Sequence, residues 1–310
     1  MSMKKLTIGV LVVALIIAGI YYLFFRSAPI ANAPLKAPEQ NEIYESNGTS
    51  TAPAPEETPV PENPSETQIG SSVENRDITA YHYGTGSKEL LFIGGIHGGY
   101  SSNTTLVAYE LMNYLDENPE KIPEGYRVTV IPVLNPDGLF KVTGSEGRFT
   151  PPTTPLSLDS TIPGRFNAHN VDLNRNFDCE WQAEGTWQTR TVSGGTAAFS
   201  EPEAQAIRNY VESHDIAGAV VWYSAAGGVF ASTCRNGISG ETQALTDAYA
   251  KASGYRAYQN FDFYEITGDM VNWFAKQNIP AISVLLSTHT STDWSKNQAG
   301  IDAFLNYFAE

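Results

Sequence analysis

The chain has 310 residues, a formal net charge of −15 and a sequence pI of about 4.7. Its lysine and arginine residues form no cluster denser than an ordinary solvated surface. These features exclude an extended basic surface for nucleic acid, and we expect no nucleic-acid partner.

The chain opens with a hydrophobic run from Leu6 to Phe25, preceded by two lysines and followed by Arg26. As a helix this run would span about 30 Å, the thickness of the hydrocarbon core of a bilayer. The lysines favour an N-terminus inside the cell. We predict that residues 1–26 form a single-pass anchor in the cell membrane and that the rest is extracytoplasmic. A cleaved signal peptide is the alternative and leads to the same location, although its apolar region is usually only about 7 to 15 residues long.

Pro, Glu, Ser, Thr, Asn and Ala dominate the next segment, residues 27–75. Almost none of its side chains could be buried, so no core offsets the entropy lost on ordering. We predict a disordered linker over residues 27–75 and one folded domain over residues 76–310.

Strand-like and helix-like segments alternate through the folded part. Runs typical of buried strands occur at residues 89–94, 126–134, 217–223 and 280–286, and helical spacing occurs at residues 104–114, 269–277 and 300–308. Residues 199–203 are expected to start a further helix, with Ser200 as its N-cap, Pro202 in the first turn and Glu203 completing a capping box. Residues 135–138 have the composition of a turn. The pattern predicts an α/β domain whose central sheet is mixed but mostly parallel, with helices on both faces.

Polar or aromatic side chains follow three predicted strands: His97, Asn135 and Tyr223. In open parallel sheets, binding sites lie outside the carboxyl ends of the strands. We therefore expect the site at this edge.

The chain has two cysteines, Cys179 and Cys234. In an extracytoplasmic domain they are expected to form a disulfide, and two buried thiols are the alternative.

Several motifs resemble those of one peptidase family. The longest is Val-Asp-Leu-Asn-Arg-Asn-Phe at residues 171–177, with Arg165 nine residues before Asn174. Around it, in order, stand Gly-Gly-Ile-His-Gly (94–98), Asn-Pro-Asp-Gly (135–138), Phe-Ser-Glu-Pro-Glu (199–203), Tyr-Glu-Ile-Thr-Gly-Asp (264–269) and Ile-Pro-Ala-Ile (279–282). Together they resemble the carboxypeptidase A-like zinc carboxypeptidases over residues 78–310.

The resemblance implies a catalytic zinc held by two histidines and a glutamate, and a second glutamate as general base. It also implies a group of residues that binds the terminal carboxylate of a peptide. The residues of this carboxylate-binding group are present. Asn174 and Arg175 match the carboxylate clamp, Arg165 matches the oxyanion arginine, and Tyr264 matches the tyrosine that closes over the bound substrate.

The catalytic half is largely replaced. His97 matches the first zinc ligand, but Tyr100 and Ser101 stand where the glutamate is due, and we assign that position to Ser101. Tyr223 stands at the second histidine, and Leu285 stands at the general base. We therefore expect zinc to be absent or weakly bound, and to be the cofactor only if the protein is active.

Three hypotheses follow. The first is an anchored domain that is catalytically impaired and binds peptides with a free C-terminal carboxylate. The second is an active zinc carboxypeptidase with unusual ligands, for which His289 is a candidate surrogate, acting on peptides or cell-wall stem peptides. The third is a structural surface domain with a relic site.

Overall fold

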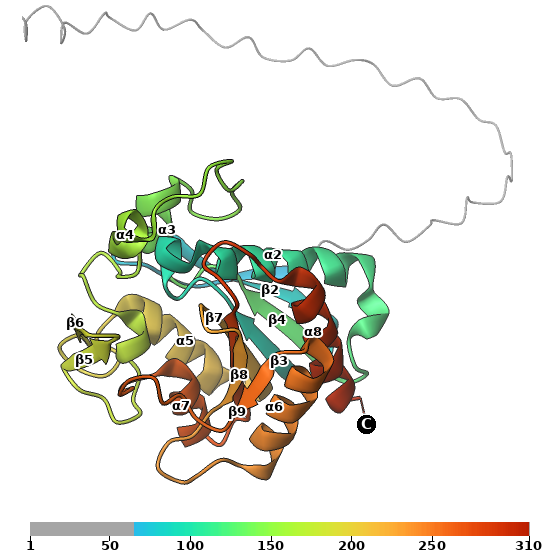
Figure 1. The fold of residues 1–310 in the computed structure, drawn as a ribbon. Coiled ribbons are helices and arrows are strands. Elements are labelled where there is room, and N and C mark those ends of the chain that lie inside the picture. Colours follow the sequence, from blue (N-terminus) through green and yellow to red (C-terminus); the bar gives the residue numbers. More distant parts are fainter. Residues whose placement is uncertain (1–64, 310) are drawn as a thin grey trace, which may run out of the picture. The chain divides into compact units, whose positions relative to one another are not determined.

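An eight-stranded sheet is the frame of the domain in the computed structural model, which describes residues 65–309 (Figure 1). The strand order is β1-β2-β4-β3-β7-β10-β8-β9. In chain order the strands are β1 (Ser65–Ser71), β2 (Asp77–Tyr83), β3 (Lys88–Ile93), β4 (Tyr126–Ile131), β7 (Asp215–Ser224), β8 (Gly228–Ala231), β9 (Arg256–Tyr258) and β10 (Ala281–Leu286). A separate hairpin pairs β5 (Glu184–Trp187) with β6 (Arg190–Ser193).

Strand direction decides where the site can form. The four central strands β4, β3, β7 and β10 are parallel to one another, so their carboxyl ends meet at one edge of the sheet. β2 pairs antiparallel with β4 and with β1, and β8 pairs antiparallel with β10. The predicted α/β fold with a mixed, mostly parallel sheet is therefore confirmed.

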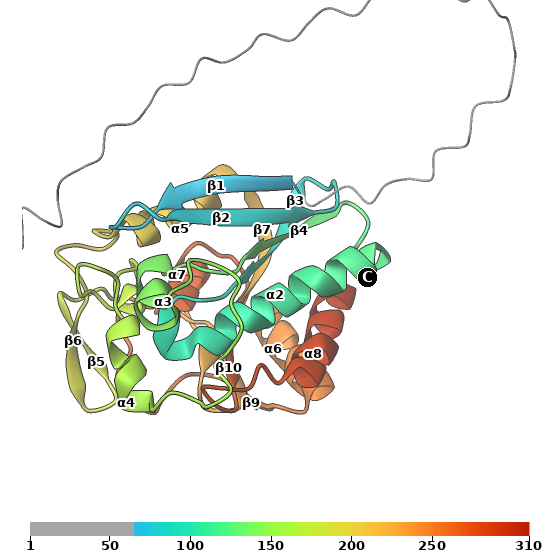
Figure 2. The same ribbon diagram turned by 90° about the horizontal axis from the view of Figure 1, so that it is seen from above.

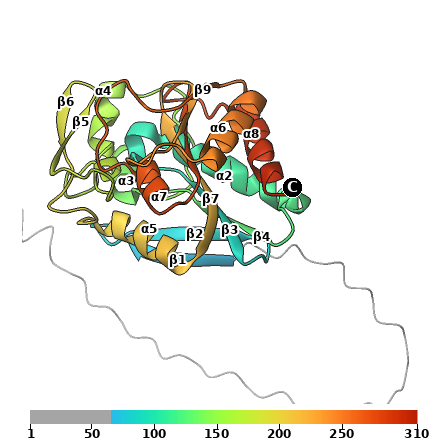
Figure 3. The ribbon, with the colours of Figure 1, turned by 90° about the horizontal axis from the view of Figure 1, so that it is seen from below.

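Helices cover both faces because successive strand residues point to opposite sides. In β3, Leu91 and Ile93 pack into a cluster with α5 and α7, while Leu90 and Phe92 pack with α2, α6 and α8. Figures 2 and 3 show α5 beside β1 and β2, apart from α2, α6 and α8. The helices are α2 (Ser102–Glu117), α3 (Pro136–Thr143), α4 (Leu158–Thr161), α5 (Pro202–Ser213), α6 (Gly240–Ser253), α7 (Met270–Lys276) and α8 (Trp294–Tyr307).

Two local predictions are wrong. Residues 135–138 begin helix α3 rather than forming an isolated turn, because the Asn135 side chain accepts a hydrogen bond from Gly138 N and caps the helix. Ser200 does not cap α5. Its hydroxyl bonds to Asn176 and Glu201 instead, and Glu201 occupies the N-cap position without a side-chain cap bond.

The predicted linker boundary at residue 75 is also wrong, since β1 belongs to the sheet. The turn between β1 and β2 is tied to the domain by buried carboxylates. Ser72 Oγ and Arg76 Nη1 donate to Asp137 at 2.6 and 2.7 Å, and Val73 N donates to Glu203 at 3.2 Å. The predicted anchor, and residues 27–64 of the predicted linker, lie outside the described residues. Within residues 65–309, no helix is long and apolar enough to cross a bilayer.

The predicted disulfide between Cys179 and Cys234 is confirmed, with Cα atoms 6.0 Å apart. It joins the segment after the 3-10 turn Leu173–Arg175 to the segment after β8. Because β8 runs antiparallel to β10, the second of these segments lies beside the amino end of β10.

We expect a chain that starts at Arg76 to be less stable than one that starts at Ser65, by more than about 2 kcal/mol. The shorter chain lacks Ser72, Val73 and Glu74, which donate to the buried carboxylates of Asp137 and Glu203, and each such loss costs about 1 to 3 kcal/mol. Urea unfolding followed by tryptophan fluorescence measures the difference. Equal free energies of unfolding would show that β1 is dispensable.

Replacing both cysteines with serine should lower the free energy of unfolding by up to about 4 kcal/mol, because the bridge spans 55 residues and its loss restores that loop entropy to the unfolded chain. Denaturant unfolding with and without reductant measures this loss. Reductant should not change the free energy of unfolding of the double variant. If it does not change that of the wild type either, the expectation is wrong.

Candidate functional site

A pocket of about 860 Å³ lies at the carboxyl edge of the parallel strands. It brings together His97, Arg165, Asn174, Arg175, Tyr223, Tyr264 and Leu285, which are far apart in the sequence. Ser101 is the exception, because it is fully buried and does not line the pocket. Tyr100 does line it. The structure therefore places Tyr100, and not Ser101, where the metal-binding carboxylate was expected.

Arg165 is fixed from two directions. Its Nε and Nη2 atoms contact Asp172 at 2.9 and 2.8 Å, and both side chains are almost completely buried. The guanidinium also lies 4.3 Å from the ring of Trp187 and 5.6 Å from that of Tyr100. Burial opposes ionisation of Asp172, but Arg165 and neighbouring groups outweigh it and hold the pKa of Asp172 well below its usual range. The pair is therefore charged, and Arg165 presents a fixed positive charge.

Arg175 is also buried, and backbone carbonyls orient it. Nε and Nη2 donate to Thr186 O at 3.2 and 2.7 Å, and Nη1 donates to Asn174 O at 2.6 Å. Gly268 permits this arrangement, since a Cβ atom there would lie 2.2 Å from the Arg175 carbonyl oxygen. The Tyr264 ring lies 5.9 Å from the Arg175 guanidinium.

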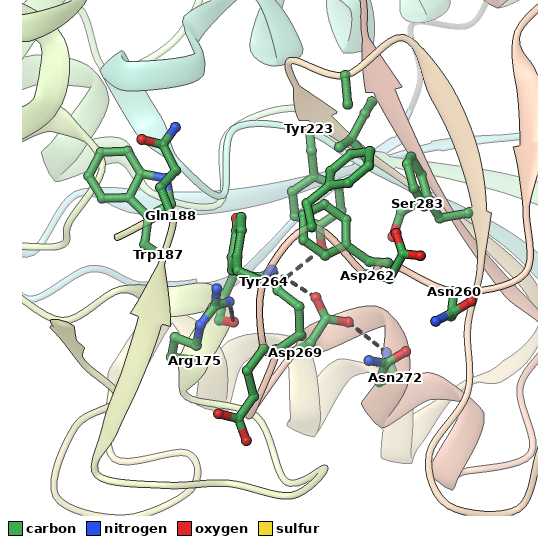
Figure 4. A pocket seen from close by; sticks show the side chains of 18 of the residues that line it. Arg175, Trp187, Gln188, Tyr223, Asn260, Asp262, Tyr264, Asp269, Asn272 and Ser283 are labelled. Carbon is green, nitrogen blue, oxygen red and sulfur yellow. Dashed lines mark hydrogen bonds between the residues drawn. The ribbon is translucent and has the colours of Figure 1, made fainter. Parts of the chain in front are cut away.

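Asn174 is held by three neighbours, of which Tyr223 and Asp269 are labelled in Figure 4. Its Oδ1 accepts from Tyr223 Oη at 3.1 Å and from Met270 N at 3.2 Å, while its Nδ2 donates to Asp269 at 2.8 Å. Two donors on the oxygen fix the amide orientation and turn its NH₂ group toward Asp269. Asp269 in turn caps α7 by accepting from Asn272 N at 2.8 Å.

The residues present do not fit a zinc site. Zinc needs three protein ligands, and His97 supplies one. Tyr223 lies with its ring 5.7 Å from that of His97, but burial raises its pKa well above the usual value, so the phenol stays neutral. Tyr100 contributes an aromatic ring where a carboxylate is needed. Within residues 65–309, no three histidine, cysteine or acidic side chains lie close enough together to hold a metal ion.

His97 itself is buried, and neither ring nitrogen has a hydrogen-bond partner among the described residues. Its Nε2 lies 3.5 Å from Asp172 Oδ1. Burial and the charge of Arg165 lower the pKa of His97 to about 4, so the imidazole is neutral near pH 7. His289, the candidate surrogate ligand, packs its ring 4.6 Å from that of Tyr100.

The position at which the general base was expected is apolar. Leu285 lies in β10 opposite Tyr223 in β7, and its side chain cannot take a proton. Of the carboxylates that line the pocket, Asp269 is the buried one, and its two oxygens accept from Asn174 and Asn272.

Sequence reasoning missed several residues that shape the pocket: Trp187, Asp269 and the loop residues 260–263. Asp269 carried a usable signal, since it is the last residue of the motif at 264–269 and the first of the helix predicted at 269–277. Trp187 carried none, because the hairpin that places it beside Arg165 is distant in sequence.

Comparisons with known proteins agree with this geometry. The family model for zinc carboxypeptidases matches residues 58–305. Gamma-D-glutamyl-L-diamino acid endopeptidase 1 of Lysinibacillus sphaericus is 24% identical over 250 residues, which cover 73% of this chain and 61% of that protein. Carboxypeptidase Z of Rattus norvegicus is 33% identical over 167 residues, covering 47% of this chain and 24% of that protein. The chain thus spans less than two thirds of the length of these relatives.

Among solved structures, murein-tripeptide amidase MpaA from Escherichia coli O157 has a TM-score of 0.56 at 19% identity, covering 80% of this chain and 92% of that one. Thrombin activatable fibrinolysis inhibitor has a TM-score of 0.60 at 15% identity, covering 80% of this chain and 69% of that one. These two likenesses concern the fold. Because the family model matches most of the sequence, this chain belongs to the zinc carboxypeptidase family.

Proposed function

We propose that this protein is a membrane-anchored, extracytoplasmic member of the family that binds peptides by their free C-terminal carboxylate and does not hydrolyse them efficiently. The observation that carries the proposal is that one pocket keeps its carboxylate-binding groups but has lost the expected catalytic ones. The groups suited to a carboxylate line it together, while a tyrosine and a leucine stand at a ligand position and the base position.

The clamp retains hydrogen-bond donors for a ligand. An arginine has five N–H groups. Arg175 uses three of them on backbone carbonyls, and Arg165 uses its Nε and Nη2 atoms on Asp172. Asn174 uses one of its two amide hydrogens on Asp269. The remaining N–H groups supply charge-assisted donors in a partly buried pocket, and a carboxylate is the group that such donors bind best.

Hydrolysis needs more than this clamp. A peptide carbonyl must be polarised, a water must be activated, and a base must take its proton. Leu285 cannot serve as the base, and His97 is the single imidazole at the expected metal position. Binding without efficient turnover is the function that these groups support best.

The proposed location depends on the hydrophobic run at residues 6–25, and the disulfide between Cys179 and Cys234 supports it because such bonds persist in oxidising compartments. The names of two similar proteins, a γ-D-glutamyl-L-diamino acid endopeptidase and a murein-tripeptide amidase, make cell-wall stem peptides the first ligands to test.

We expect C-terminal amidation of a bound peptide to weaken binding about 10- to 100-fold, because a charge-assisted pair in such a pocket contributes roughly 1.5 to 3 kcal/mol. Arg175→Ala should lose a similar factor. Arg175→Lys keeps the charge but not the planar fork, so its affinity for the acid peptide should lie between those of the wild type and Arg175→Ala. Isothermal titration calorimetry measures all four affinities. A wild type that binds acid and amide equally would favour the relic-site hypothesis, since amidation leaves the protein itself unchanged.

We expect the purified protein to hold far less than one zinc per chain after dialysis, because one imidazole leaves zinc mostly bound to water. With zinc added, release of the C-terminal residue should stay at the level of a control without protein. Elemental analysis and chromatography of the products measure the two quantities. Turnover that stops with a chelator and with His97→Ala would instead establish an active peptidase with unusual ligands.

A further inference from the structure

One polar side chain in the wall of the pocket is left without a partner. His97 lines the pocket and is 5% exposed, and within residues 65–309 neither of its ring nitrogens makes a hydrogen bond. Buried polar groups in folded proteins nearly always have a hydrogen-bond partner, so an orphaned group in a pocket points to a ligand that supplies one. Carboxylate binding as proposed above gives His97 no part, because it uses the two arginines and Asn174.

The neighbouring carboxylate decides which ring nitrogen carries the hydrogen. His97 Nε2 lies 3.5 Å from Asp172 Oδ1, and Asp172 is ionised by its pairing with Arg165. An anion repels a nitrogen lone pair and attracts an N–H group, so the hydrogen of the neutral imidazole lies on Nε2. Nδ1 therefore carries the lone pair and is a hydrogen-bond acceptor.

The donors closest to His97 already have other partners. The ring of Tyr223, labelled in Figure 4, lies 5.7 Å from that of His97, but its hydroxyl donates to Asn174 Oδ1 at 3.1 Å. Arg165 contacts Asp172 through Nε and Nη2. Nδ1 is thus an unused acceptor beside groups that are already hydrogen-bonded.

This acceptor lies close to the clamp. Asp172 Oδ1, which faces His97, also accepts from Asn174 N at 3.1 Å, so a single oxygen atom lies between the imidazole and the clamp residue. A peptide C-terminus carries its nearest donor in a matching place, because the N–H of the last residue is separated from the carboxylate only by the α-carbon. A carboxylate held by Asn174 and Arg175 therefore brings this N–H toward His97.

We propose that His97 is a ligand-binding residue whose Nδ1 atom accepts a hydrogen bond from the N–H of the last peptide bond, so that the pocket discriminates amides from esters at this bond. The inference rests on the proposed carboxylate binding and adds the class of bond beside the carboxylate. A depsipeptide, whose last residue is a 2-hydroxy acid joined through an ester oxygen, has no N–H there. Its oxygen would set a lone pair against that of Nδ1 and leave this buried acceptor unsatisfied.

The test uses three ligands of otherwise identical sequence: a peptide that ends in alanine, a depsipeptide that ends in lactate, and the peptide with alanine amide at its end. Lactate replaces the N–H by oxygen and keeps the methyl group and the terminal carboxylate. Binding to the full chain, purified in detergent, is measured by calorimetry. We expect the wild type to bind the peptide about tenfold more tightly than the depsipeptide.

Three replacements of His97 separate the two ring nitrogens. Asparagine sets its side-chain oxygen near the position of Nδ1, glutamine reaches the position of Nε2, and phenylalanine keeps a ring without either nitrogen. We expect His97→Asn to retain a preference for the peptide, and His97→Gln and His97→Phe to bind peptide and depsipeptide within about twofold of each other. The matched control is His214→Asn, at an exposed histidine beside the amino end of β7 and outside the pocket, which should leave all three affinities unchanged.

A spectroscopic measurement addresses the same atom in the wild type. The chain has five histidines, and labelling them with ¹⁵N gives a resonance for each ring nitrogen. Binding of the peptide should move the Nδ1 resonance of His97 upfield, because this nitrogen accepts a hydrogen bond without becoming protonated. Binding of the depsipeptide should move it less.

The possible failures are distinguishable. If the depsipeptide binds as tightly as the peptide while amidation still weakens binding, this inference is wrong and the carboxylate proposal stands. If amidation changes nothing, the proposed function itself is wrong. A preference for the peptide that persists undiminished in His97→Phe would assign the N–H to another acceptor and overturn the role of His97. If a His97 variant does not fold, the wild-type affinities and the Nδ1 resonance decide the question.

Discussion

The site depends on one buried carboxylate, Asp172. It accepts a hydrogen bond from Arg165 Nε and forms an ion pair with Arg165 Nη2, its Oδ1 accepts from Asn174 N at 3.1 Å, and it faces His97. Its own backbone N donates to Ser193 O at 2.9 Å, which ties the β5–β6 hairpin to the pocket. A buried anion is costly unless it is paired, so its surroundings must supply cations and N–H donors. Meeting that requirement places Arg165 and Asn174 in fixed positions within the pocket.

Part of the support for the clamp comes from a residue at an expected metal-ligand position. Asn174 is oriented by Tyr223, Met270 and Asp269, and Arg175 by backbone carbonyls. Tyr223 stands where a histidine ligand is due, yet its hydroxyl orients the amide that the clamp needs. Tyr100 likewise stands where a carboxylate is due, and its ring lies against Trp187 and near Arg165. These two replacements therefore support the carboxylate half of the pocket directly, by hydrogen bonding and packing.

Hydrophobic runs and contiguous motifs carried most of what could be predicted. The buried strands are continuous apolar segments, and residues 171–177 place Asn174 and Arg175 on one loop regardless of distant contacts. The rest depends on tertiary structure. Ser200 stands where an N-cap is expected from the sequence, but its hydroxyl accepts a hydrogen bond from Asn176 instead of capping the helix. Residues 65–71 resemble the polar segment before them and become a strand because β2 and α5 offer partners. The sequence could not decide whether Tyr100 or Ser101 stands at the expected carboxylate position. The turn after His97 decides it, because it directs Tyr100 toward the pocket.

Recognition and catalysis place different demands on this pocket. Recognition of a carboxylate needs fixed donors, and the buried pairs around Asp172 and Asn174 provide them without a metal. Catalysis needs a metal-bound water and a base that takes its proton. Leu285, at the expected base position, cannot accept a proton even if a metal is held. Asp269, the buried carboxylate that lines the pocket, already accepts hydrogen bonds from Asn174 and Asn272. The groups that recognition of a carboxylate needs line the pocket, while Leu285 at the expected base position cannot take a proton.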